Sequence, residues 1–287
     1  MKPWGIAKRT ALSTILLCVV LTLFVMFAAA CSEGEPSTTT PVSVVQPTTT
    51  TEAGQPTTVS QPAETASYET VTFVTEDGLT LSGRLYDPAV GGESYWTAAS
   101  GVVLSHMYPA DQTSWNDVAE YLAENGLSVL TFDFRGYGDS EGSKDIAQID
   151  TDVAAAVQFL SGTGVQEVVL VGASMGGTAS LMAAADLQAL SSLRIAGVVT
   201  LSAPVEFMGL EAEGAVPQLV VPMLFISAEQ DEGASGARDL EQLSGGVGEL
   251  EILAGSGHGT DLFAGPSAEQ VWNLMLDFLT ENLSTAS

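Results

Sequence analysis

The chain of 287 residues carries 35 acidic side chains against 8 basic ones, a formal net charge of −27. So acidic a surface argues against nucleic acid as a partner, because phosphate binding needs a basic surface. With 46% hydrophobic residues, the length suits one large α/β domain with appended segments.

The first thirty residues have the pattern of an export signal. Basic residues precede an apolar stretch over positions 11–27, and three alanines then lead to Cys31. The pattern resembles a bacterial lipoprotein signal, although Ala28 stands where leucine is usual, and it predicts a signal peptide over 1–30 with a lipid on Cys31. An ordinary secretory signal and an uncleaved helix remain alternatives, and all three place the domain outside the cytoplasm. Membrane fractionation of a Cys31→Ser variant would separate them.

The segment that follows the signal is predicted to be a disordered linker over residues 31–67. From Ser32 to Ser67 it contains ten threonines and five prolines, without apolar periodicity. Such a composition cannot bury enough surface to fold, and its prolines favour extended conformations. The only other cysteine, Cys18, lies inside the signal, so the predicted domain over residues 68–287 has neither a free thiol nor a disulfide.

Strand-like and helix-like patterns alternate through that domain. A hairpin is predicted around Asp77-Gly78. Buried strands are predicted at residues 101–105, 128–132, 167–171, 196–201, 222–227 and 248–253. Helical periodicity begins near Trp115, near Ile149 and after Ser267, where Ser267-x-x-Gln270 predicts a capping box. This order indicates a mostly parallel sheet with an antiparallel N-terminal hairpin and helices on both faces.

The chemical centre of the chain is predicted at Ser174. The apolar strand 167–171 leads directly into Gly172-Ala-Ser174-Met-Gly176, and a helix-forming sequence follows. Strand, sharp turn and helix are the context of a nucleophile elbow, in which the serine hydroxyl stands clear of the sheet. The Met175 backbone N–H would then face an oxyanion at a helix N-terminus. The alternative is a tight turn with an incidental serine.

A serine nucleophile needs a base, and the base needs an acid. Of the two histidines, His258 lies between glycines after the last predicted strand and is the predicted base. His106 ends the first parallel strand and is interpreted as a loop-shaping residue. Asp231 follows a strand after a turn of three residues and is the predicted acid, although Glu229 and Glu232 flank it and blur the assignment.

The order Ser174, Asp231, His258 resembles that of the α/β-hydrolase fold family, over roughly residues 68–282. Four further stretches are similar to the family: Leu104–Tyr108 to its oxyanion segment, Trp115 to an aromatic residue soon after it, Phe132–Ser140 to a loop in which Asp133 and Arg135 brace their surroundings, and Val221–Leu224 to the lead into the acid. The resemblance is to serine esterases and lipases, and to the serine aminopeptidase-like subgroup.

The resemblance implies a serine hydrolase that needs no cofactor or metal. The Tyr108 and Met175 N–H groups would form the oxyanion hole, although Met107 stands where the family often has glycine. We expect a monomeric carboxylic-ester hydrolase, anchored by lipid to the outer face of the cell membrane. A thioesterase, a serine peptidase and a non-catalytic binding module remain alternatives.

The substrate is expected to be a small acyl ester, because the sequence leaves room for only a minimal cap. The connection over residues 202–221 is too short for more than a helical turn or two, and Phe207, Met208 and Leu210 are the apolar groups that it could offer over Ser174.

Overall fold

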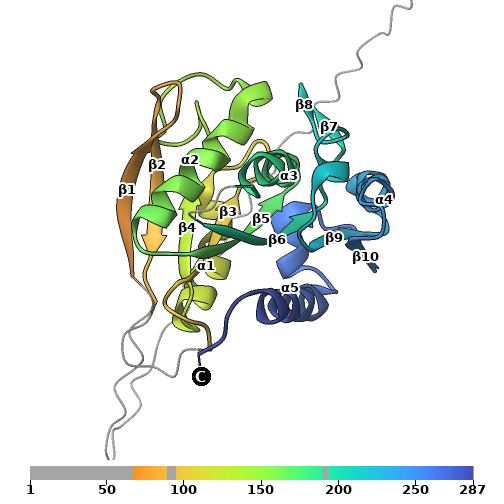
Figure 1. Cartoon of the computed structure of the whole chain (residues 1–287). Coiled ribbons are helices and arrows are strands. Elements are labelled where there is room, and N and C mark those ends of the chain that lie inside the picture. Colours follow the sequence, from red (N-terminus) through yellow and green to blue (C-terminus); the bar gives the residue numbers. More distant parts are fainter. Residues whose placement is uncertain (1–66, 89–94, 190–192, 287) are drawn as a thin grey trace, which may run out of the picture. The chain divides into compact units, whose positions relative to one another are not determined.

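The computed structural model describes residues 67–88, 95–189 and 193–286 (Figure 1). The predicted signal peptide, the lipidation site Cys31 and nearly all of the linker lie outside these residues, so these assignments stay predictions. Within the part of the chain described, no helix combines the length and the apolar character needed to cross a membrane.

A mixed sheet of eight strands in the order β1-β2-β4-β3-β5-β6-β9-β10 organises the domain (Figure 1). The strands are β1 (Tyr68–Val74), β2 (Thr80–Tyr86), β3 (Ser100–Ser105), β4 (Ser128–Phe132), β5 (Glu167–Ala173), β6 (Arg194–Leu201), β9 (Met223–Ala228) and β10 (Gly248–Leu253). β1 and β2 pair antiparallel, as do β2 and β4, and the pairings from β4 to β10 are parallel. The predicted N-terminal hairpin and mostly parallel sheet are confirmed.

Helices cover both faces of this sheet (Figure 1). They are α1 (Asn116–Glu124), α2 (Ile149–Gly162), α3 (Met175–Leu187), α4 (Gly233–Leu243) and α5 (Ala268–Asn282). Alternate residues of β5 show why the strand is apolar throughout: Val168 and Leu170 belong to the core that includes α2, α3 and α4. Val169 and Val171 belong to the core that includes α1 and α5. A strand covered on both faces needs apolar side chains at every position.

The connection between β6 and β9 is as short as the sequence predicts. It contains a small hairpin of β7 (Glu206–Phe207) and β8 (Leu210–Glu211), followed by one 3₁₀ turn, η3 (Val216–Gln218). A cap of this size cannot enclose a long tunnel over the sheet edge.

Two details differ from the sequence-based expectations. Helix α4 is absent from the predicted elements, because its glycines weaken the helical pattern. Gly236 is needed for close approach, since a Cβ there would lie 2.7 Å from the Ala203 carbonyl oxygen. The predicted capping box is wrong: α5 does begin after Ser267, but the Ser267 hydroxyl donates to the Ala254 carbonyl instead of capping the helix.

Candidate active site

The turn between β5 and α3 holds Ser174 in a strained conformation. Its φ of 47° and ψ of −117° lie in a region that residues other than glycine rarely adopt. The Ser174 N–H donates to the Leu201 carbonyl at 2.7 Å, and the Ser174 carbonyl accepts from Gly177 and Thr178. The serine is 7% exposed. The neighbouring backbone therefore fixes this residue at the C-terminal edge of the sheet.

The glycines around Ser174 are required by space. A Cβ on Gly172 would lie 2.4 Å from the Gly176 carbonyl oxygen, and one on Gly176 would lie 2.3 Å from the Ser105 carbonyl oxygen. Real Cβ atoms essentially never come so close to other heavy atoms. The same contact shows that the first turn of α3 lies against the end of β3, where the predicted oxyanion segment begins.

His258 and Asp231 meet across two loops that follow neighbouring parallel strands, β10 and β9. Their Nδ1 and Oδ1 atoms are 2.8 Å apart. The Asp231 side chain is 3% exposed, whereas the His258 side chain is 30% exposed. Since the carboxylate accepts at Nδ1, the histidine keeps its Nε2 lone pair available. The structure thus joins the predicted base to the predicted acid.

Several donors converge on Asp231. Ser227 donates its hydroxyl to Oδ2 at 3.1 Å. Burial of the Asp231 carboxyl opposes ionisation, but hydrogen bonds from Ser202, His258 and the Gly233 N–H outweigh it and hold the pKa of Asp231 below its ordinary value. The acid is therefore ionised at neutral pH.

The flanking carboxylates, Glu229 and Glu232, are exposed. Neither contacts His258 in the described part of the chain.

The histidine loop reaches the serine turn through Gly259. This residue has a φ of +57°, and a Cβ on it would lie 3.2 Å from the Cβ of Ala173, the residue before Ser174. The described side chains show no hydrogen bond between Ser174 and His258. In unliganded enzymes this bond is often long and tightens only when substrate is bound. The two loops are adjacent through Gly259 and Ala173.

Two backbone N–H groups were predicted to form the oxyanion hole. Met175 is the first residue of α3, so its N–H has no acceptor within the helix and lies at the positive end of the helix dipole. Tyr108 lies in the loop after β3, and among described backbone groups neither N–H has a carbonyl partner. Met107 is not among the described residues with positive φ, so its backbone does not require the glycine that the family often has there.

His106 is fully buried and both of its nitrogens are occupied. Nδ1 lies 3.0 Å from the Met107 carbonyl, and Nε2 accepts from the Phe134 N–H at 3.2 Å. A backbone N–H can only donate, so the proton of the neutral ring is on Nδ1. Burial lowers the pKa of His106. The predicted loop-shaping role is confirmed by these contacts.

The Phe132–Ser140 stretch is a bracing loop, as predicted. Arg135 is buried, and its guanidinium bonds to Asp152 at 2.6 Å and to Asp77 at 3.0 Å. The Asp133 carboxylate accepts from the backbone and the side-chain amide of Gln112, at 2.9 and 2.8 Å. The two buried charged side chains of this loop, Asp133 and Arg135, thus have their hydrogen-bond partners within the protein.

The small β7–β8 hairpin forms part of the wall beside the serine turn. The Phe207 ring lies 5.8 Å from the Tyr108 ring, and Met208 is 62% exposed at the tip of the hairpin. The expectation that Leu210 would also face the site is wrong, because this residue is fully buried in the core with α3. Its side chain fills space under the hairpin instead of lining the opening.

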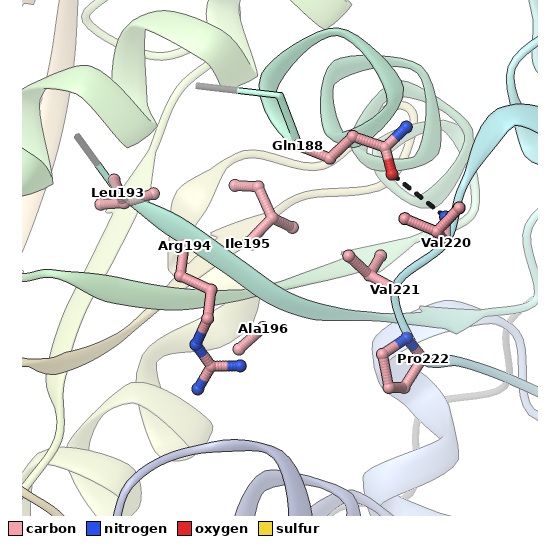
Figure 2. A pocket seen from close by; sticks show the side chains of 8 residues that line it. All are labelled: Gln188, Leu193, Arg194, Ile195, Ala196, Val220, Val221 and Pro222. Carbon is pink, nitrogen blue, oxygen red and sulfur yellow. Dashed lines mark hydrogen bonds between the residues drawn. The ribbon is translucent and has the colours of Figure 1, made fainter. Parts of the chain in front are cut away.

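A hollow lies at the opposite end of the sheet from Ser174, near the N-terminal ends of the strands. This cavity of about 370 Å³ is lined by Gln188, Leu193, Arg194, Ile195, Ala196, Val220, Val221 and Pro222 (Figure 2). Arg194 begins β6, so the cavity adjoins the N-terminal ends of the strands, away from Ser174. The Gln188 side chain accepts from the Val220 N–H and donates to Gln218, and Arg194 pairs with Glu167. Its polar groups are already used within the protein.

Metal chemistry has no evident place in the described residues. Across residues 67–88, 95–189 and 193–286, no group of three or more histidine, cysteine, aspartate or glutamate side chains is arranged to hold a metal ion. The polar side chains at the C-terminal sheet edge are the imidazole of His258, the carboxylate of Asp231 and the hydroxyls of Ser174, Ser202 and Ser227.

Comparisons with known proteins agree with this architecture. Residues 102–220 match the profile of a family described as alpha/beta hydrolase fold. An esterase of Pyrococcus furiosus superposes with a TM-score of 0.61 at 18% identity, covering 76% of this chain and 92% of that one. The chain has the α/β-hydrolase fold. A dienelactone hydrolase of Anabaena variabilis gives a TM-score of 0.61 at 22% identity, over 77% of this chain and all of the other.

Curated relatives of this hydrolase-fold chain match it over shorter stretches. A polyketide transferase of Penicillium crustosum, claH, is 38% identical over 100 residues, or 33% of this chain and 32% of the relative. The thiohydrolase aneE of Aspergillus aculeatus is 35% identical over 131 residues, or 42% and 38%. The chain thus spans well under half the length of the curated relatives that it matches.

Sequence reasoning missed two polar residues of this site, Ser227 and Ser202. Ser202 follows β6, has a φ of 59°, and accepts the Gly259 N–H on its hydroxyl oxygen at 3.1 Å. A single serine after a strand gives no spacing signal. Its role becomes visible only when the loops are placed together.

Proposed function

We propose that this chain is a serine hydrolase that cleaves carboxylic esters through an acyl-enzyme on Ser174. The observation that carries the proposal is the convergence of three loops: the strained Ser174 turn, and the bonded His258–Asp231 pair whose loop packs on that turn through Gly259. A nucleophile, a base with a free nitrogen and an ionised acid are the groups that acyl transfer requires. The export signal would hold this activity on the outer face of a membrane through Cys31.

The first half of the reaction forms the acyl-enzyme. His258 Nε2 takes the hydroxyl proton of Ser174 as the serine oxygen attacks the ester carbonyl. The Met175 and Tyr108 N–H groups donate to the resulting oxyanion, and Asp231 stabilises the imidazolium. The tetrahedral intermediate then collapses, and the leaving alcohol departs with the proton from Nε2.

The second half returns the enzyme to its starting state. Water gives a proton to His258 Nε2 and attacks the acyl carbon, and the same two N–H groups donate to the second oxyanion. The carboxylic acid product is released as His258 Nε2 returns the proton to the Ser174 oxygen. Both halves use the same residues, so no further group is needed to balance the protons.

Thioesters are the second candidate substrates, because the relative from Aspergillus aculeatus is named a thiohydrolase. A thioester presents the same acyl carbonyl to the same machinery, and only the leaving group differs. Matched butyrate esters and thioesters, compared by kcat/KM, would decide between the two substrate classes.

A fluorophosphonate probe tests whether Ser174 is an activated nucleophile at all. We expect one probe per chain, bound at Ser174 and identified by peptide mass, because only a serine with a general base beside it reacts readily. The Ser174→Ala variant should stay unlabelled, and circular dichroism should show it folded. A folded, unaltered chain that remains unlabelled would contradict the proposal and favour a non-catalytic binding module.

A further inference from the structure

Ser202 occupies an unusual position at the end of β6. It is fully buried, and its φ of 59° is in the left-handed region, where serine is uncommon. The Ser202 N–H donates to the Ile226 carbonyl at 2.8 Å, which carries the pairing of β6 and β9 one residue past the strand. Backbone strain at a non-glycine residue persists only where the surroundings hold it, and such positions cluster at functional sites.

The hydroxyl of Ser202 lies between the two loops that supply the acid and the base. Its oxygen accepts the buried N–H of Gly259, the residue directly after His258, at 3.1 Å. On the other side, a Cβ placed on Gly233 would lie 2.9 Å from the Ser202 Cβ and 3.0 Å from the Asp231 Oδ2. The Asp231 carboxylate is the neighbouring acceptor for the hydroxyl proton, and hydrogen bonding from Ser202 is one of the causes that hold the pKa of Asp231 below its ordinary value.

This inference rests on the proposed function. We infer that Ser202 is a positioning residue whose single hydroxyl ties the Asp231 loop to the His258 loop and so fixes the imidazole relative to Ser174. Among the described residues, Ser202 has no hydrogen bond to Ser174. Its effect is exerted through Asp231 and Gly259, and it complements the direct bond of 2.8 Å between Asp231 and His258.

Two substitutions distinguish the effect of the Ser202 hydroxyl from that of the strained backbone. Ser202→Ala removes the hydroxyl and keeps a Cβ, whereas Ser202→Gly also relieves the positive φ. We expect both to lower kcat by about 10- to 100-fold, the size of a lost hydrogen bond to a charged group, with KM within about twofold. The Ser202→Gly variant should do so without a lower melting temperature, so loss of fold would not explain its loss of rate.

The matched control is Ser180→Ala. Ser180 is also fully buried and hydroxyl-bonded, to Ser105 at 3.3 Å, but it does not contact Asp231 or the histidine loop. It should leave kcat nearly unchanged. Equal losses of kcat in Ser180→Ala and Ser202→Gly, or full activity in both Ser202 variants, would overturn the inference.

A spectroscopic measurement keeps this test separate from that of the proposed function. In the full-length protein with ¹⁵N-labelled histidine, the Nδ1 proton of His258 should be slow to exchange, because it is bonded to Asp231. In Ser202→Gly it should exchange faster, while the Nδ1 proton of the buried His106 stays unchanged. Unchanged exchange at His258 overturns the inference even in a chain without esterase activity. If the chain is not labelled by the fluorophosphonate but the His258 Nδ1 proton exchanges faster in Ser202→Gly, only the proposed reaction is contradicted and the inference about Ser202 stands.

Discussion

The two histidines of this chain occupy equivalent places and do different work. His106 follows β3 and His258 follows β10, both at the C-terminal edge of the parallel sheet. Both nitrogens of His106 are bonded to backbone groups inside the core, whereas His258 bonds Nδ1 to Asp231 and, in the proposed mechanism, uses Nε2 for proton transfer. A histidine can act as a general base only if the fold leaves one of its ring nitrogens unpartnered.

The largest predicted effect comes from substituting each of the two histidines in turn. His258→Ala should lower kcat by about 10⁴- to 10⁶-fold, because loss of a triad member removes the base. His106→Gln should keep kcat within about tenfold but lower the free energy of unfolding by about 1–3 kcal/mol, since it leaves a buried group unpaired. Steady-state kinetics and urea unfolding of both variants measure the two effects.

The comparison would fail if the order were reversed. A folded His106→Gln protein with as little activity as His258→Ala would mean that the buried histidine, or the loop that it shapes, carries the proton. A His258→Ala protein with unaltered kcat would show that His258 is not the base.

The sequence was sufficient for those parts of the fold and site that depend on local pattern. The strand before Ser174 is apolar because both of its faces are covered, and Gly172 and Gly176 are present because no Cβ fits. Both facts are readable in one short stretch. The pairing of Asp231 with His258 could be predicted from their order after successive strands, because parallel strands end at the same edge.

The remaining features depend on contacts between segments that are distant in the sequence. Gly233 lies at the start of α4 and packs on Ser202, so glycine there serves close approach although it weakens the helical pattern. The Ser267 hydroxyl has a carbonyl acceptor near the end of β10 and is therefore diverted from the helix cap. Ser202 bonds to Gly259 across 57 residues of sequence. None of these choices has a local signature.

The next effect concerns the acid, where three carboxylates are close in sequence. Asp231→Asn should lower kcat by about 10⁴-fold, because an amide in place of the carboxylate favours the wrong histidine tautomer. Glu229→Gln and Glu232→Gln alter exposed side chains without contact to His258 and should change kcat by no more than about twofold. A damaging Glu232→Gln would show that the acid is assigned to the wrong residue.

The pH profile sharpens the same point. The pKa of Asp231 is held below its ordinary value, so its carboxylate stays ionised well into the acidic range. Activity should therefore fall with decreasing pH because the histidine base takes up a proton, and not because the Asp231 carboxylate does so. In the Asp231→Asn variant no carboxylate stabilises the imidazolium, so the rate should be lower. This residual rate should still fall with decreasing pH. A flat profile of kcat/KM from about pH 5 to 8 in the unaltered protein would rule out a histidine base.

The smallest expected effect concerns the acyl chain of the substrate. The Tyr108 ring, in the predicted oxyanion segment, lies 5.8 Å from the Phe207 ring of the β7–β8 hairpin, and Met208 is 62% exposed at the hairpin tip. A site with so small a cap can bury only the first methylenes of an acyl group. Each buried methylene is worth about 0.8 kcal/mol, or roughly fourfold in kcat/KM, and those that remain in water add nothing.

We therefore expect kcat/KM to rise over the shortest acyl esters and then to level off, without activation by a lipid interface. Met208→Ser should bring the plateau to a shorter chain. Val220→Ser, which alters an apolar residue that is 81% exposed at the far edge of the sheet, should leave the plateau where it is. A kcat/KM that still climbs steeply from butyrate to palmitate esters under monomeric conditions would require an enclosed tunnel. The short connection between β6 and β9 offers no such enclosure: Leu210 is committed to the core, and Met208 projects into solvent.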